Sequence, residues 1–168
     1  MIQCTSAEAA KLLRGLNEKL SLLLSKENQS KEFVAAINED IESVRPQYHY
    51  ANVQQEIDQL EQQIRKLKHA INVFNTTHKV PNFDMTIDEM LVYIPQLSAR
   101  KMKLQRMANR LPKERKVTMS GSNIIDYVYA NYDVEKVEQD MRNTSDLLAQ
   151  AQTALDLVNN SETMEVEL

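Results

Sequence analysis

The three histidines are the residues of this chain whose chemistry most readily suggests a metal site. His49, His69 and His78 are far apart, and no two of them have the His-x₃-His spacing of ligands on one helix. His78 and Asp84 are close enough in sequence to share a metal ion. Ligand spacing nevertheless favours solvated surface histidines. We therefore predict no metal ligand, and His78 with Asp84 stays open as the alternative.

The single cysteine, Cys4, is the remaining candidate for nucleophilic chemistry. It precedes a predicted helix, whose N-terminus would lower the pKa of the thiol and favour the thiolate. No histidine or asparagine partner can be assigned to it, and it cannot form an internal disulfide. Glycine occurs at only two positions, so no phosphate-cradling loop is expected. We predict no catalytic residue, no cofactor and no enzyme activity.

Charge is divided between two segments of the chain. Residues 98–116 hold eight basic residues and one acidic residue, whereas 133–168 hold nine acidic residues and two basic ones. One interpretation is a basic helix that binds nucleic acid, with tyrosines stacking on bases. Its contacts would be the cations Arg100, Lys101, Lys103, Arg106 and Arg110.

A second interpretation of these charges is that the two segments pair with one another. Such pairing would fix antiparallel order or subunit register. We favour it, because an acidic partner would cancel much of the field that an external phosphate would feel.

Long helices must position these residues. The 168 residues include two Gly, four Pro and no Trp, which indicates few turns and a mostly helical protein. The clearest helix has apolar residues at alternating steps of four and three, a period that predicts a left-handed coiled coil. These residues are Val53, Ile57, Leu60, Ile64, Leu67, Ile71 and Phe74. The last helix has a similar stripe that includes Val137, Met141, Leu148 and Leu155.

These stripes are the predicted interface of the protein. We expect the Val53 helix to pack against the helices that begin near Ile87 and Val134, or against copies of them in another subunit. Two capping boxes, Thr5-x-x-Glu8 and Thr86-x-x-Glu89, mark helix starts. The predicted helices span about 5–26, 52–75, 86–111 and 133–159.

Other segments are less regular. Pro95 predicts a kink or a later helix start. Residues 28–50 could form a helix or a short strand, and helix is slightly favoured. A β-hairpin is predicted at about 117–132, around the turn Ser120-Gly121-Ser122. The acidic segment 160–168 is expected to leave the bundle as a tail.

Composition also excludes some classes of protein. The net charge is −4, so no global positive field steers nucleic acid. No apolar run approaches the roughly 20 residues that a membrane span needs. The first residues lack the basic start and apolar core of a signal peptide. Together with the lone cysteine, this predicts a cytoplasmic location.

Four segments resemble the septicolysin-like proteins, small bacterial proteins of largely uncharacterised function. They are "INVFNTT", "MTIDEMLVYIPQL", "NYDVEKVEQDM" and "LDLVNNSETMEVEL", which occur in the family's order. The chain departs from the family at Tyr93 and Ile94, where an Arg-Asp pair is usual, and at Asn160, where Trp is usual. The resemblance implies a helical coiled-coil body, a small β element and a homo-oligomer. The cytolytic activity in the family name is not carried over, because no stretch looks able to enter a bilayer.

The sequence therefore predicts a mainly α fold, an antiparallel helical bundle or coiled coil with a small β-hairpin, as a single helical domain over 1–168. The expected function is that of a self-associating interaction or scaffold protein. The alternative is a nucleic-acid-binding module that uses the basic stretch 100–116. A metal-binding or pore-forming protein comes third.

Overall fold

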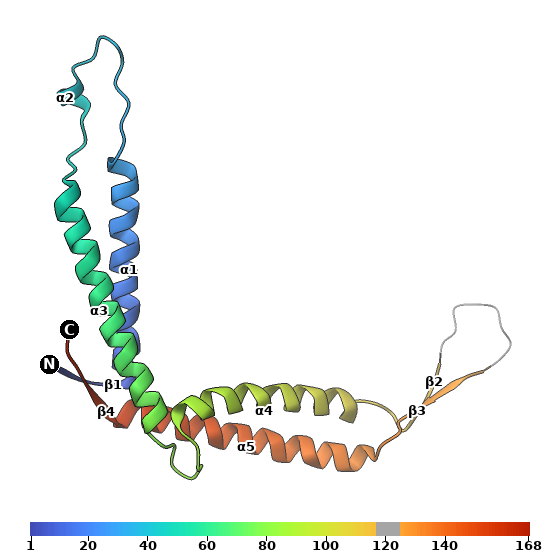
Figure 1. Ribbon diagram of the computed structural model, residues 1–168. Coiled ribbons are helices and arrows are strands. Elements are labelled where there is room, and N and C mark those ends of the chain that lie inside the picture. The colour runs from blue at the N-terminus through green and yellow to red at the C-terminus, as the bar shows by residue number, and fades with distance from the viewer. Residues whose placement is uncertain (117–124) are drawn as a thin grey trace. The chain divides into compact units, whose positions relative to one another are not determined.

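The computed structural model describes residues 1–116 and 125–168 (Figure 1). The fold is mainly α, as the sequence predicted, and it has two small antiparallel strand pairs where one small hairpin was expected. The chain divides into two compact units. Unit 1 comprises Met1–Thr77 and Val158–Leu168, and unit 2 comprises His78–Leu157. The sequence predicted a single helical domain and did not indicate this division into two units.

Two long helices form the body of unit 1. Helix α1 (Ser6–Ser30) begins at the predicted capping box of Thr5 and Glu8, and helix α3 (Tyr50–Thr77) lies beside it (Figure 1). All apolar residues of the predicted α3 stripe turn inward. Ile57, Ile64, Leu67 and Phe74 are buried, whereas Val53, Leu60 and Ile71 are half-buried.

The partner of α3 in its own unit is α1, which the sequence had not indicated. The expected partners were the helices that begin near Ile87 and Val134. A heptad stripe specifies that a helix has a partner but carries little information about which one. The spacing of Leu13, Leu16, Leu20 and Leu23 places them on one face of α1, and all four are only half-buried.

The predicted tail at 160–168 is wrong. Helix α5 (Val134–Ser161) ends at Ser161, and Thr163–Val166 forms strand β4, which pairs antiparallel with strand β1 (Ile2–Thr5). Met164 and Val166 are buried, while the glutamates between and after them are exposed. This alternation is the period of a strand with one buried face, which the acidic composition of the segment concealed.

The slight preference for helix at 28–50 is also wrong for most of that segment. Helix α1 continues to Ser30, and only Ile41–Val44, helix α2, is helical in the connection 31–49. Helical spacing of apolar residues stabilises a helix only where a surface is present to bury them. No such surface forms here, and Phe33, Val34, Ile37 and Ile41 are exposed.

Unit 2 is built on helix α4 (Ile87–Ala108) and the Val134–Leu157 part of α5 (Figure 1). Helix α4 begins at the second predicted capping box and buries Ile87, Met90 and Leu97. It contains Pro95, so the alternative of a later helix start is wrong. In α5 the predicted stripe faces inward: Val137, Leu148 and Leu155 are buried and Met141 is half-buried.

A short two-stranded ribbon connects these helices. Strand β2 (Lys113–Arg115) pairs antiparallel with strand β3 (Tyr127–Tyr129). Helix α4 ends at Ala108, three residues before the predicted end at 111. Strand β2 therefore begins at Lys113, earlier than the predicted start of the hairpin at 117. The predicted turn at Ser120-Gly121-Ser122 lies outside the described residues.

Candidate functional site

One face of the β2–β3 ribbon combines cations with aromatic rings. The register pairs Lys113 with Tyr129 and Arg115 with Tyr127, while Glu114 pairs with Val128. Directly paired residues share a face of a ribbon and alternate residues point to opposite faces. Lys113, Arg115 and the two tyrosines therefore lie on one face, and Glu114 with Val128 lies on the other.

The aromatic side chains of this face are close together and open to solvent. The ring centroids of Tyr127 and Tyr129 are 6.4 Å apart with 50° between their planes. Lys113 Nζ lies 4.2 Å from the centroid of Tyr127 and 5.5 Å from that of Tyr129. Tyr127 is 47% exposed and Tyr129 is 62% exposed. The two rings thus contact one cation while both tyrosines remain exposed to solvent.

Backbone hydrogen bonds continue the β2–β3 ladder beyond both ends of the two strands. The Ala130 N–H donates to the Pro112 carbonyl at 3.0 Å, and the Lys116 N–H donates to the Asp126 carbonyl at 2.8 Å. Beyond the ribbon, the Tyr132 hydroxyl donates to the Met107 carbonyl at 3.0 Å, which ties the start of α5 to the last turn of α4. Tyr132 is thus used internally, unlike Tyr127 and Tyr129.

The predicted nucleic-acid contacts lie on the second half of α4 and just beyond it. Arg100, Lys103, Arg106 and Arg110 are exposed, and Lys101 is half-buried. Arg110 is 3.8 Å from Glu114, its one ion-pair partner among the described residues. The other four have no carboxylate within ion-pair distance in the described part of the chain.

The favoured pairing of basic and acidic segments is not what the structure shows. Acidic residues of α5 form ion pairs on α5 itself: Lys136 with Asp140 and Arg142 with Glu138, each at 2.8 Å. No ion pair joins residues 98–116 to residues 133–168 within the described ranges. Pairs spaced by four residues on one helix form locally at low entropic cost, whereas pairs between helices depend on register.

The structure assigns Asp84 to an ion pair with a neighbouring cation. Its carboxylate binds the Lys79 ammonium, which holds the pKa of Asp84 below its usual range and raises the pKa of Lys79. A cation bound to Asp84 opposes binding of a metal ion there. No group of three His, Cys, Asp or Glu gathers in a metal-binding arrangement among residues 1–116 and 125–168. His69 is exposed on α3, as expected.

Cys4 shows the opposite of the expected pKa shift. The residue is 4% exposed and lies on the inner face of β1, opposite Met164 of β4. Burial, followed by the negative charge of Glu8, raises the pKa of this thiol. Both effects disfavour the thiolate, so Cys4 is a poor nucleophile. The helix N-terminus that was expected to lower the pKa instead engages Glu8, whose carboxylate accepts a hydrogen bond from the Thr5 N–H at 2.9 Å.

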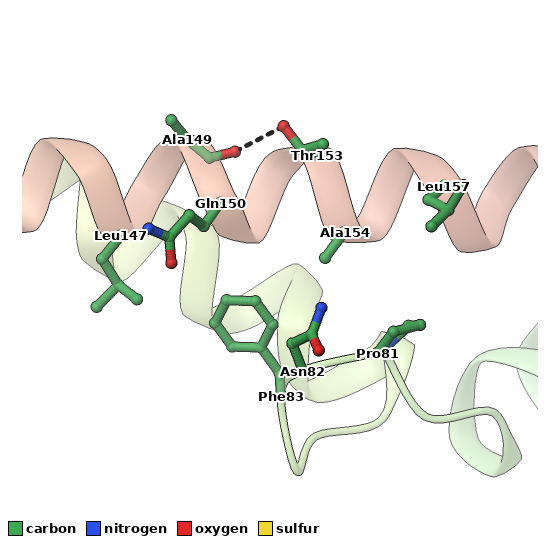
Figure 2. A pocket seen from close by; sticks show the side chains of 9 residues that line it. All are labelled: Pro81, Asn82, Phe83, Leu147, Ala149, Gln150, Thr153, Ala154 and Leu157. Carbon is green, nitrogen blue, oxygen red and sulfur yellow. Dashed lines mark hydrogen bonds between the residues drawn. The ribbon is translucent and has the colours of Figure 1, made fainter.

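A groove of about 630 Å³ lies in unit 2 between the loop before α4 and the exposed side of α5 (Figure 2). The lining side chains are uncharged: Pro81, Asn82, Phe83, Leu147, Ala149, Gln150, Thr153, Ala154 and Leu157. The Thr153 hydroxyl donates to the Ala149 carbonyl at 2.9 Å, so it is engaged with its own helix (Figure 2). The lining has no titratable group and hence no acid–base pair for catalysis.

Sequence reasoning named the cations of α4 and expected tyrosines to stack on bases, but it did not place Lys113 and Arg115 beside the tyrosines. The ribbon face depends on cross-strand register, which places Lys113 beside Tyr129 and Arg115 beside Tyr127. The alternation of Tyr127 and Tyr129 around Val128 was visible in the sequence, but the partner strand was not.

None of the helices that the structure describes is long and apolar enough to cross a membrane.

Comparisons with known proteins support the fold alone. No family model matches the chain, and no curated protein matches it. The chain is similar to a solved structure described as a functionally unknown conserved protein from Corynebacterium diphtheriae. The two share 16% sequence identity with a TM-score of 0.61, over 98% of this chain and 100% of the other. The resemblance to septicolysin-like proteins stays a prediction.

Proposed function

We propose that the protein is a self-associating interaction or scaffold protein and that unit 1 provides the contact. The observation that supports this is the incomplete seam between α1 and α3. Leu13, Leu16, Leu20 and Leu23 lie three or four residues apart on one face of α1, and all four are only half-buried although α3 lies beside this helix. Two helices bury one stripe each, whereas stable bundles usually enclose a core between four. A second α1–α3 pair would complete such a core.

Exposed apolar residues lie beside this seam. Leu22 is 63% exposed and Leu24 is 45% exposed near the C-terminal end of α1. The adjoining connection 31–49 exposes Val34 at 93% and Ile37 at 102%. Apolar side chains gathered at one end of a helical pair are typical of a surface that another chain covers. Symmetric homodimers are the commonest way of covering such a surface.

Oligomeric state tests this proposal. Light scattering coupled to gel filtration should give a mass at least twice 19.4 kDa for the wild type. Leu22→Glu with Leu24→Glu should shift the protein toward the monomer. The matched control is Leu91→Glu with Leu111→Glu, which places the same charges at exposed leucines of unit 2 and should leave the mass unchanged. A wild type that is strictly monomeric at tens of micromolar would exclude self-association.

A second candidate is nucleic-acid binding, because four cations of α4 have no ion-pair partner among the described residues. Exposed and unpaired lysine and arginine side chains can neutralise phosphates and release counterions. A gel-shift assay with DNA and RNA at low salt tests this function. The apparent affinity should fall steeply as salt increases, and Arg100→Gln with Arg106→Gln should weaken binding. Lys66→Gln with Lys68→Gln on α3 is the control, since both residues are exposed and distant in sequence.

We also propose a cytoplasmic location. The lone Cys4 is buried, and no disulfide can form within the chain. Proteins of oxidising compartments are more often stabilised by disulfides. Cell fractionation followed by immunoblotting should recover the protein with cytosolic markers, and recovery with membranes or in the medium would contradict the proposal.

A further inference from the structure

We propose that the exposed face of the β2–β3 ribbon, formed by Lys113, Arg115, Tyr127 and Tyr129, is a stacking platform for single-stranded nucleic acid. This inference rests on the second candidate function above and goes beyond it in naming the strand type and the residues. The ribbon face adds aromatic planes to the phosphate-binding charges of α4. That combination is how proteins hold single strands without reading their sequence.

The two tyrosine rings are suited to unpaired bases. Their centroids are 6.4 Å apart, and the planes are tilted by 50°. Two bases stacked on these rings could not remain parallel to one another, so they would have to be splayed. Bases of a single strand can adopt that arrangement, whereas bases in a duplex keep their faces stacked inside the helix. The geometry therefore favours single strands over duplexes.

Cations lie where the phosphates of such a strand would run. Lys113 Nζ is 4.2 Å from the Tyr127 centroid, and Arg115 is the cross-strand neighbour of the same tyrosine. The nearby acid Glu114 belongs to the opposite face and pairs with Arg110 at 3.8 Å. Asp126 flanks the ribbon, where its backbone carbonyl accepts from the Lys116 N–H.

A polyanionic strand fits this face better than an acidic protein surface does. Of the six paired residues of β2 and β3, the four on this face supply aromatic planes and cations, and the aliphatic Val128 lies on the opposite side. An acidic peptide would be held by charge alone and would gain little from the tyrosines. A nucleic acid gains from both, because each base offers a π face and each linkage offers a charge.

Fluorescence anisotropy with the full-length protein tests the platform. The probes are a labelled oligothymidylate of about 15 nucleotides and a mixed-sequence duplex of about the same length, at low salt. Tyr127→Leu with Tyr129→Leu should weaken binding of the single strand at least about tenfold. Binding of the duplex should be unchanged, because it depends on phosphate contacts. Tyr127→Phe with Tyr129→Phe keeps the rings and should bind the single strand like the wild type.

Controls separate this inference from the function on which it rests. Tyr50→Leu removes an exposed tyrosine of α3, 67% exposed, and should change nothing. One outcome is that Arg100→Gln with Arg106→Gln weakens binding of both probes, whereas Tyr127→Leu with Tyr129→Leu changes the affinity for neither. The chain would then bind nucleic acid, but the ribbon would not be a stacking platform. If neither probe binds the wild type, the binding function and the platform both fail.

Two further outcomes also decide the question. In the first, polyglutamate displaces the labelled oligothymidylate as well as unlabelled oligothymidylate does, and it does so equally from the wild type and from the Tyr127→Leu, Tyr129→Leu variant. The face would then recognise negative charge alone, and the platform would be overturned. Thermal unfolding monitored by circular dichroism shows whether the Tyr127→Leu, Tyr129→Leu variant is folded. If it is not, Tyr127→Leu and Tyr129→Leu are measured singly, and each should weaken binding of the single strand by about threefold. Unchanged affinity in both single variants would overturn the platform.

Discussion

Cys4 of β1 lies directly opposite Met164 of β4, so the two ends of the chain meet in one antiparallel pair. Both side chains are buried on the inner face of this small sheet. The same register pairs Ile2 with Val166, the other buried residue of β4. A segment that looks like a charged tail is therefore part of the unit 1 core.

The Cys4–Met164 register predicts a crosslink. Directly opposed residues of an antiparallel pair have Cβ atoms about 4.5–5.5 Å apart, which a disulfide can bridge with a small adjustment. Met164→Cys should therefore form a disulfide with Cys4 under mild oxidation. Non-reducing electrophoresis should show faster migration than the reduced protein.

The matched control for the crosslink is Glu165→Cys. Position 165 pairs with Gln3 and its side chain points to the opposite face, so no internal disulfide should form. Crosslinking of both variants alike would mean that the register is wrong. Since such a bridge closes nearly the whole chain into a loop, the oxidised Met164→Cys protein should also unfold at a higher temperature.

The Thr86 cap predicts a defined loss of stability. The Glu89 N–H donates to the Thr86 hydroxyl at 3.3 Å, and the Thr86 N–H donates to the Glu89 carboxylate at 2.7 Å. Thr86→Ala should lower the free energy of unfolding by about 1 kcal/mol, the usual cost of losing such a cap. Urea titration followed by circular dichroism measures this. Thr86→Ser keeps the hydroxyl and should remain close to the wild type.

The same cap predicts a pH dependence with a definite sign. Hydrogen bonds from the Thr86 backbone and hydroxyl hold the pKa of Glu89 below its ordinary value of 4.5. A depressed carboxylate pKa contributes stability that is present above 4.5 and is lost as the pH falls through the folded-state value. The wild type should exceed Glu89→Gln in stability at neutral pH, and the difference should shrink in acid. A difference that grows in acid would contradict the assignment.

Burial of the α3 stripe predicts unequal costs along one helix. Leu67 is 0% exposed, whereas Val73 of the same helix is 46% exposed. Leu67→Ala should lower the free energy of unfolding by about 2–5 kcal/mol, because it leaves a cavity where a fully buried side chain was packed. Val73→Ala should cost well under about 1 kcal/mol. Equal effects of the two substitutions would mean that α3 does not bury this stripe.

The ion pair between Lys79 and Asp84 predicts a response to salt rather than to metal. Both side chains are largely exposed, so their attraction is screened by ions. Asp84→Asn should lower the melting temperature slightly at low salt and not at high salt. Zinc should leave the melting temperature of the wild type unchanged. A zinc-dependent rise that disappears in Asp84→Asn would establish the metal site that the ion pair argues against.

Local patterns in the sequence anticipated much of the structure. The capping boxes at Thr5 and Thr86 start α1 and α4 as expected, because the partner groups are three residues apart. The stripes from Val53 to Phe74 and from Val137 to Leu155 turn inward, because a 3.5-residue period places them on one helical face. The reactivity of Cys4 could not be predicted in the same way, because Cys4 is buried by a strand from the far end of the chain.

The sequence by itself determined the four long helices, the caps of α1 and α4, and the apolar faces of α3 and α5, all of which depend on residues within a turn or two of one another. Only the tertiary structure decided that α3 lies beside α1, that Thr163–Val166 pairs with Ile2–Thr5, and that the Lys113 and Tyr127 side chains share a ribbon face. Those choices depend on contacts between distant segments. Their register is set by mutual burial and backbone pairing, which a local pattern permits but does not specify.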